Sequence, residues 1–181
     1  MVYRFIILSD EVDNFRRDVT IDSDATFYDL HNAILDSVGF TKDQITSFFI
    51  CDDDWAKKTE ITLIEMDSNT EEDNYVMEET PLSDLLEDEK QKLLFVFDNL
   101  TERLFFMELR EIIPGENLKK AKVVRSDGEA PSQMLSMDDL DNTIIPNIVP
   151  EIDDDFFDGE INIDEYDEED MGNLMDDTNL W

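Results

Sequence analysis

Short segments in which apolar and polar positions alternate predict strands along much of the chain. Residues 2–8 and 15–21 are rich in β-branched and aromatic side chains, and a polar, acidic turn separates them. This arrangement predicts an antiparallel hairpin. The same reasoning predicts four further strands, at 46–51, 60–66, 93–98 and 103–110. The last two are the most apolar, so we expect them at the centre of the sheet.

One segment has helical periodicity instead. Thr26 and Asp29 have the spacing of a capping box, and Gly39 marks the end of the helix. The apolar residues that recur at helical spacing are Phe27, Leu30, Ile34 and Val38. This stripe predicts that the helix packs on the sheet. His31 lies beside the stripe, and we expect it to be half-buried with one hydrogen bond.

The predicted elements follow one another as a hairpin, a helix, two strands, a short helix at 81–86 and a second hairpin. An acidic surface loop is expected at 67–79, before the short helix. This order predicts an α+β domain, in which one main helix packs on a mixed β-sheet.

The composition changes after residue 135. The chain has 181 residues, 48 acidic and 14 basic, and a formal net charge of −34. Residues 136–181 hold 17 of the acidic residues and no lysine or arginine. Large apolar side chains are interspersed among these acids. We therefore expect a folded domain at 1–135 and an acidic, aromatic-punctuated C-terminal segment at 136–181, called here the acidic tail.

The negative charge argues against direct binding of nucleic acid or of an anionic membrane, because both bind through clustered lysine and arginine. The longest apolar run, 93–97, is far below the roughly 18 residues that span a bilayer. The first residues lack the pattern of a signal peptide. The single cysteine, Cys51, is expected to be a buried apolar residue at a strand end. These features predict a cytoplasmic protein.

Four separated blocks of the sequence carry a family resemblance. They are Phe15-Arg16-Arg17, the segment Thr26 to Ile34, the strand Leu94 to Asp98, and Gly128 to Pro131. In this order they resemble the plasmid ORF-three-like family, also described as insertion-sequence passenger-type proteins, over roughly residues 1–135. The resemblance implies a β-grasp-like domain and supplies no activity. The chain departs from the family pattern after Asp98, which implies that any polar site of the family there is largely erased.

One stretch of the acidic tail has the spacing of an EF-hand calcium loop. The candidate calcium ligands are Asp154, Asp158, Asn162 and Glu165. Gly159 falls at the sharp turn of such a loop. Phe156 occupies a position that needs an oxygen ligand, and Pro146 and Pro150 interrupt the incoming helix. Calcium binding by the tail is therefore kept as an alternative, and no other cofactor is expected.

The function that we expect is a non-enzymatic protein-interaction module. The acidic tail would bind a basic surface of a larger partner that handles nucleic acid, such as RNA polymerase, and would act as a nucleic-acid mimic or accessory factor. The candidate apolar anchors are Phe156, Phe157, Tyr166, Leu174 and Trp181. The candidate charged contacts are Asp167, Glu168, Glu169 and Asp170.

Two other interpretations stay open. The first is an enzyme or small-ligand-binding domain, and its pocket would lie near His31, Asp98, Arg16 and Arg17. In the second, the tail keeps the protein soluble or covers the basic cluster of its own domain. That cluster consists of Lys119, Lys120, Lys122 and Arg125.

Overall fold

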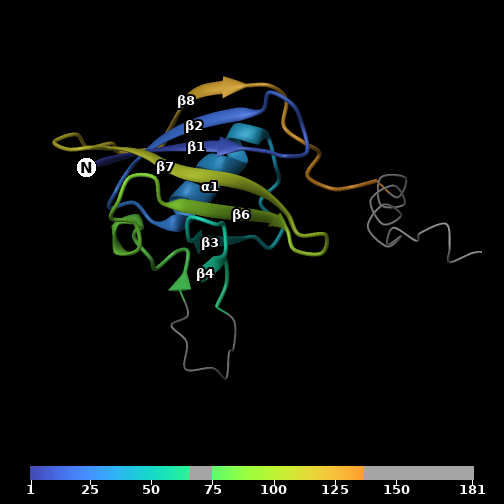
Figure 1. The fold of residues 1–181 in the computed structure, drawn as a ribbon, viewed down its shortest axis with the longest axis horizontal. Coiled ribbons are helices and arrows are strands. Elements are labelled where there is room, and N and C mark those ends of the chain that lie inside the picture. The colour runs from blue at the N-terminus through green and yellow to red at the C-terminus, as the bar shows by residue number, and fades with distance from the viewer. Residues whose placement is uncertain (66–74, 137–181) are drawn as a thin grey trace, which may run out of the picture. The chain divides into compact units, whose positions relative to one another are not determined.

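The computed structural model describes residues 1–65 and 75–136. These residues form one eight-stranded sheet with a single α-helix, α1 (Phe27–Val38), on one face (Figure 1). A short 3-10 helix, η1 (Leu82–Asp84), precedes the sixth strand. The strands are β1 (Val2–Leu8), β2 (Arg16–Asp22), β3 (Ser47–Cys51), β4 (Lys57–Thr62), β5 (Tyr75–Val76), β6 (Lys92–Asp98), β7 (Arg103–Ile113) and β8 (Lys122–Asp127).

Neighbouring strands are antiparallel, except that β5 runs parallel to β4. The order across the sheet is β5-β4-β3-β6-β7-β1-β2-β8. β1 and β2 form the predicted hairpin, in which Val2 lies opposite Asp22 and Leu8 opposite Arg16. β6 and β7 occupy the two middle positions of the sheet, which confirms that the most apolar pair lies at its centre.

The β-grasp-like α+β fold class predicted from the sequence is wrong. The described residues form a sheet-dominated fold with eight strands, where the sequence predicts six, and with one α-helix. β1 is antiparallel to both of its neighbours, β2 and β7, so the N-terminal hairpin continues into a long antiparallel sheet. The short helix expected at 81–86 is reduced to the three residues of η1.

The two additional strands, β5 and β8, lack the pattern by which strands are predicted. The residues of β8 from Lys122 to Ser126 are all exposed, so buried and exposed positions do not alternate along it. Its backbone pairs with β2 at the edge of the sheet, where Arg17 lies opposite Ser126. β5 has only two residues, in the stretch 67–79 where the acidic composition predicts a loop. Residues 67–74 of that stretch lie outside the described residues.

Helix α1 begins and ends as its sequence predicts. The Thr26 hydroxyl accepts from the Asp29 amide at 3.2 Å, and the Asp29 carboxylate accepts from the Thr26 amide at 3.0 Å. Gly39 ends the helix in the left-handed region, with φ at 70°. Such a φ is favourable mainly for glycine, which has no Cβ. The predicted stripe contributes Phe27, Leu30 and Ile34 to the core.

The hydrophobic core lies between α1 and the sheet. The β6 residues Leu93, Phe95 and Phe97 face the helix side and are buried, as the alternation predicts. Phe105 of β7, rather than Phe106, faces them, and its ring centroid is 4.7 Å from that of Phe97. Cys51 is buried at the end of β3, which confirms its expected place. No helix among the described residues is long and apolar enough to cross a bilayer.

Candidate functional site

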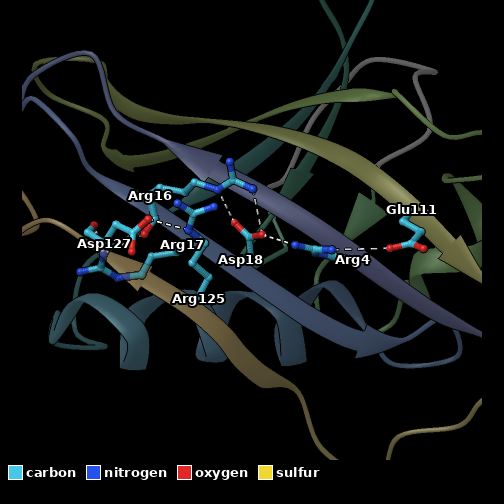
Figure 2. A network of polar contacts seen from close by, with 7 residues as sticks. All are labelled: Arg4, Arg16, Arg17, Asp18, Glu111, Arg125 and Asp127. Carbon is cyan, nitrogen blue, oxygen red and sulfur yellow. Dashed lines mark hydrogen bonds and ion pairs between the residues drawn. The ribbon is translucent and has the colours of Figure 1, made fainter.

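A network of ion pairs lies on the sheet face opposite α1. Asp18 of β2 has no exposed side-chain surface and lies between Arg4 and Arg16 (Figure 2). Arg16 donates from Nε and Nη2 to the two Asp18 oxygens at 2.6 and 3.0 Å, and Arg4 Nη2 donates at 2.7 Å. Burial raises the pKa of Asp18, but these hydrogen bonds outweigh it and hold the pKa below its ordinary value. The carboxylate is therefore a charged structural element of the sheet.

The side chain of Arg17, the next residue along β2, lies on the opposite face of the sheet, on the side of α1. It donates to the carbonyl oxygens of Ser37, Asp127 and Gly128 at 3.2, 2.6 and 3.1 Å. These bonds tie the last turn of α1 to the end of β8. Burial lowers the pKa of Arg17, and the charge of Asp127 acts in the opposite direction. Four backbone carbonyls, including that of Arg16 at 2.9 Å, occupy this guanidinium, so its role is to hold two elements together.

The other arginines are bound in the same way. Arg103, at the start of β7, donates to the two Glu11 oxygens at 2.8 and 2.6 Å and to the carbonyls of Ser132 and Gln133. Among the described residues, the remaining arginine ion pairs are Arg4 with Glu111, Arg110 with Glu108 and Arg125 with Asp127. All six arginines of the chain thus donate to oxygens of the protein itself.

His31 is more deeply buried than the sequence predicts. Its side of α1 faces the sheet, and its ring stacks on Tyr28 and meets Phe95 edge-on at 5.8 Å. The residue is 1% exposed, and neither ring nitrogen has a hydrogen-bond partner in the described part of the chain. Burial, with a smaller contribution from Lys42, lowers the pKa of His31 to about 4, although Asp36 acts against it. The expectation of a half-buried, hydrogen-bonded histidine is therefore wrong.

An open cleft of about 550 Å³ lies beside the start of β3 and the ends of β4 and β6. Its apolar lining residues with high exposure are Ile45, Ile64 and Leu100, at 54%, 52% and 96%. Its acidic lining residues are Asp43, Glu60 and Asp98. No lysine or arginine is among the described residues that line it. This cleft, called here the acidic cleft, is the candidate functional site of the folded part.

Hydrogen bonds lower the pKa values of Asp98 and Asp43, two of the acidic residues that line the cleft. Burial raises the pKa of Asp98, but hydrogen bonds from the Thr101 hydroxyl at 2.7 Å and the Leu100 amide at 3.0 Å outweigh it, and the pKa is lowered. The Thr41 hydroxyl lowers the pKa of Asp43. Asn99 donates to the Ile45 carbonyl at 3.0 Å. This bond fixes the turn that carries Leu100 to the segment that precedes β3. The cleft is therefore lined by negative charge, and hydrogen bonds fix the turn that follows β6.

The structure does not bring together the pocket predicted near His31, Asp98, Arg16 and Arg17. His31 lies in the core, and Arg17 holds the end of β8. Asp98 lines the acidic cleft, whereas Arg16 lines a separate groove of about 310 Å³ beside Trp55 and Phe106. The four residues thus lie in different parts of the fold and have different partners.

The predicted tail sites lie outside the described residues. The calcium ligands Asp154, Asp158, Asn162 and Glu165 and the anchors Phe156, Phe157, Tyr166, Leu174 and Trp181 fall within 137–181. The same is true of Asp167, Glu168, Glu169 and Asp170. In the basic cluster, Lys119 and Lys120 line a shallow cavity with Asp29 and Asp36 of α1.

The sequence predicts a site at Asp98 but not the acidic cleft that surrounds it. Ile45, Ile64 and Leu100 come from three separate segments, and a single exposed apolar residue is ordinary on a protein surface. The one local signal is Leu100, an apolar residue in the otherwise polar turn 99–102. Only the pairing of β3 with β4 and β6 gathers these side chains.

Comparison with known proteins gives a family and a fold. The family model of plasmid pRiA4b ORF-3-like proteins matches residues 2–135, which confirms the resemblance inferred over roughly 1–135. A crystal structure of a protein of unknown function from Methanosarcina mazei Go1 is similar at a TM-score of 0.53 and 19% identity, over 69% of this chain and 68% of that one. At this identity the likeness supports the fold alone. No curated protein is significantly similar to the chain.

Proposed function

We propose a function from the premise that this chain belongs to the family of plasmid pRiA4b ORF-3-like proteins, whose description names no activity. The protein is an interaction module, and its acidic tail binds a basic surface of a partner protein that handles nucleic acid. The tail carboxylates occupy the positions that phosphates take on that surface. The apolar residues among them fix register and affinity.

One observation carries this proposal. Residues 136–181 contain 17 acidic residues, no lysine or arginine, and large side chains such as Phe156, Tyr166 and Trp181. A segment with this charge alone would remain solvated and extended. Aromatic side chains among the acids supply buried contact area, which is where most interface energy arises. The combination favours a segment that binds a cationic surface.

The charge of the folded part also favours a basic partner. Its six arginines already donate to oxygens of the protein, as described above. Residues 1–135 carry 31 acidic and 14 basic residues, so they too are strongly negative. A nucleic acid would be repelled by both parts of the chain, whereas a basic protein surface would be attracted by both.

The test is affinity purification of the tagged full-length protein from its own cells at low salt, followed by mass spectrometry. A tail variant replaces Asp167, Glu168, Glu169 and Asp170 by the corresponding amides. A control variant makes the same change in charge at four exposed acids of the folded part. Those acids are Asp13, Glu78, Glu116 and Glu129.

We expect the wild type and the control variant to recover the same nucleic-acid-binding protein and the tail variant to lose most of it. Free DNA or RNA should compete for this partner, because it binds the same basic surface. Recovery should also fall steeply above about 0.15 M salt, where exposed charges are screened beyond about 8 Å. Equal recovery by the two variants, or partners that do not bind nucleic acid, would refute the proposal.

A further inference from the structure

The acidic cleft concentrates apolar surface that the fold leaves uncovered. The described residues include nine large apolar side chains with high exposure, and three of them, Ile45, Ile64 and Leu100, line this one cleft. Leu100 is 96% exposed at the tip of a turn whose base is fixed by Asp98. Scattered exposed apolar residues need no explanation, but their convergence on a hollow is typical of an interaction site.

The charge of the cleft decides what kind of partner it fits. The carboxyl groups of Asp43, Glu60 and Asp98 line the cleft, and no basic residue is among its described lining residues. Ser47 and Thr62 add only neutral polar groups. An anionic ligand such as a nucleic acid or a phosphorylated peptide would be repelled. No group of three potential metal-ligating residues is placed to hold a metal ion in the described part of the chain.

A basic side chain matches both features of the cleft at once. The hydrocarbon stems of arginine and lysine pack on apolar surface while their charged heads stay in water. In this cleft the stem would lie on Ile45, Ile64 and Leu100, and the head would reach Glu60 or Asp98. The guanidinium of arginine also pairs with a carboxylate through two hydrogen bonds, which gives geometric specificity.

We infer that the acidic cleft binds a basic, apolar-flanked segment of the same protein partner, as a second contact beside the acidic tail. This inference rests on the proposed function, because the tail selects a partner that is rich in basic residues. Two weak contacts on one chain would raise the overall affinity through effective concentration, provided that both can be engaged at once.

The test uses the full-length, ¹⁵N-labelled protein and a blocked peptide of alternating leucine and arginine. A second peptide with glutamate in place of arginine serves as the control ligand. Binding at the cleft is followed through the amide signals of Ile45, Ile64 and Leu100, so that any binding to the acidic tail is resolved separately. The cleft variant is Glu60→Gln with Leu100→Ser, both at exposed positions. The matched control is Glu116→Gln with Val124→Ser, which makes the same changes on another part of the surface.

We expect the arginine peptide to shift the three cleft amides in a saturable way and the glutamate peptide to leave them unchanged. The cleft variant should bind at this site about tenfold more weakly, and the control variant within about twofold of wild type. Dispersed amide spectra of both variants show that they are folded. Unshifted cleft amides, or equal weakening in the two variants, would overturn the inference.

The tail variant, in which the four acids at 167–170 are replaced by amides and which is called here the four-amide tail variant, distinguishes this inference from the proposed function. It should lose its cellular partner and still bind the arginine peptide at the cleft. If the cleft fails its test while the tail variant still loses the partner, the proposed function stands and the cleft inference falls. If the cleft binds the peptide and the tail variant keeps its partner, the proposed function falls, and with it the assignment of the cleft to that partner.

Discussion

At the scale of single residues, His31 couples folding to pH. Its pKa falls from 6.5 to about 4 on folding, chiefly because burial disfavours the charged ring. The unfolded chain therefore binds more protons than the native protein below about pH 6.5, and stability falls as pH falls through this window. We expect a loss of about 2 kcal/mol from this group between about pH 7.5 and about pH 5.

The measurement is urea denaturation of wild type and of His31→Leu at both pH values. The carboxyl groups titrate in both proteins, so the difference between the two losses isolates the histidine. The variant should lose about 2 kcal/mol less than wild type on acidification. Identical pH dependence in the two proteins would contradict a histidine that is buried in the neutral form.

Asp18 is the residue on which the ion-pair network depends. Replacing it by asparagine keeps the shape of the side chain but leaves Arg4 and Arg16 facing a neutral amide. We expect Asp18→Asn to lower the free energy of unfolding by about 2–3 kcal/mol at neutral pH.

The depressed pKa of Asp18 means that its own contribution to stability is lost as pH falls below the ordinary value of 3.8. The difference between wild type and variant, measured by urea denaturation, should therefore shrink in acid. Asp13→Asn, at an exposed position, is the control and should change little.

At the scale of elements, a comparison of two glycines distinguishes the cost of backbone strain from the cost of a steric clash. Gly39 and Gly128 have similar φ values, 70° and 67°, so alanine is strained at either position. A Cβ at Gly39 meets nothing within 4 Å, whereas a Cβ at Gly128 lies 2.5 Å from the carbonyl oxygen of Asn14. We expect Gly39→Ala to cost about 1 kcal/mol and Gly128→Ala at least about 2 kcal/mol, because the end of β8 must move away from the β1–β2 turn. Thermal and urea unfolding of the two variants measure the loss of stability. Equal losses would mean that the β1–β2 turn moves aside at no cost and that the clash at Gly128 is relieved.

The elements also show what the sequence can reveal about this fold. Helix α1 and the β6–β7 pair are predictable because local signals, a capping box and dense alternation of apolar residues, coincide with their tertiary roles. The β-grasp-like fold class fails because β1 is antiparallel to both β2 and β7, and because the sheet gains the edge strand β8, which is fixed by pairing with β2 and not by its own composition. Its exposed residues, such as Lys122 and Arg125, read as a basic cluster without strand periodicity. An edge strand buries few side chains and therefore leaves little trace in the pattern.

The candidate site was predictable only in part, for a similar reason. Asp98 stands out because it ends an aromatic strand, but nothing local connects it with Ile45 or Glu60. Their proximity depends on the placement of β3 between β4 and β6, and strand order is a tertiary property. The same topology separates Asp98 from the residues predicted to lie near it, which are His31, Arg16 and Arg17. They lie in the core, on the open face and at the end of β8.

At the scale of the whole molecule, the net charge of −34 opposes the compact state. Unfolding moves these charges apart, so added salt should stabilise the native protein by screening their repulsion. The network around Asp18 works against this effect, but that carboxylate is fully buried and is therefore screened less. We expect the thermal midpoint to rise by several degrees between about 0.02 M and about 0.3 M sodium chloride, as the screening length falls from about 20 Å to about 6 Å.

Two controls make this prediction specific to charge repulsion. Choline chloride should raise the midpoint as much as sodium chloride does, because screening does not depend on which monovalent cation is present. The four-amide tail variant, with four fewer negative charges, should show a smaller rise, since less repulsion remains to be screened. A midpoint that falls with salt would mean that ion pairs such as Arg103 with Glu11 outweigh the repulsion. The negative charge would then cost the native state little, and it could be retained for partner binding without loss of stability.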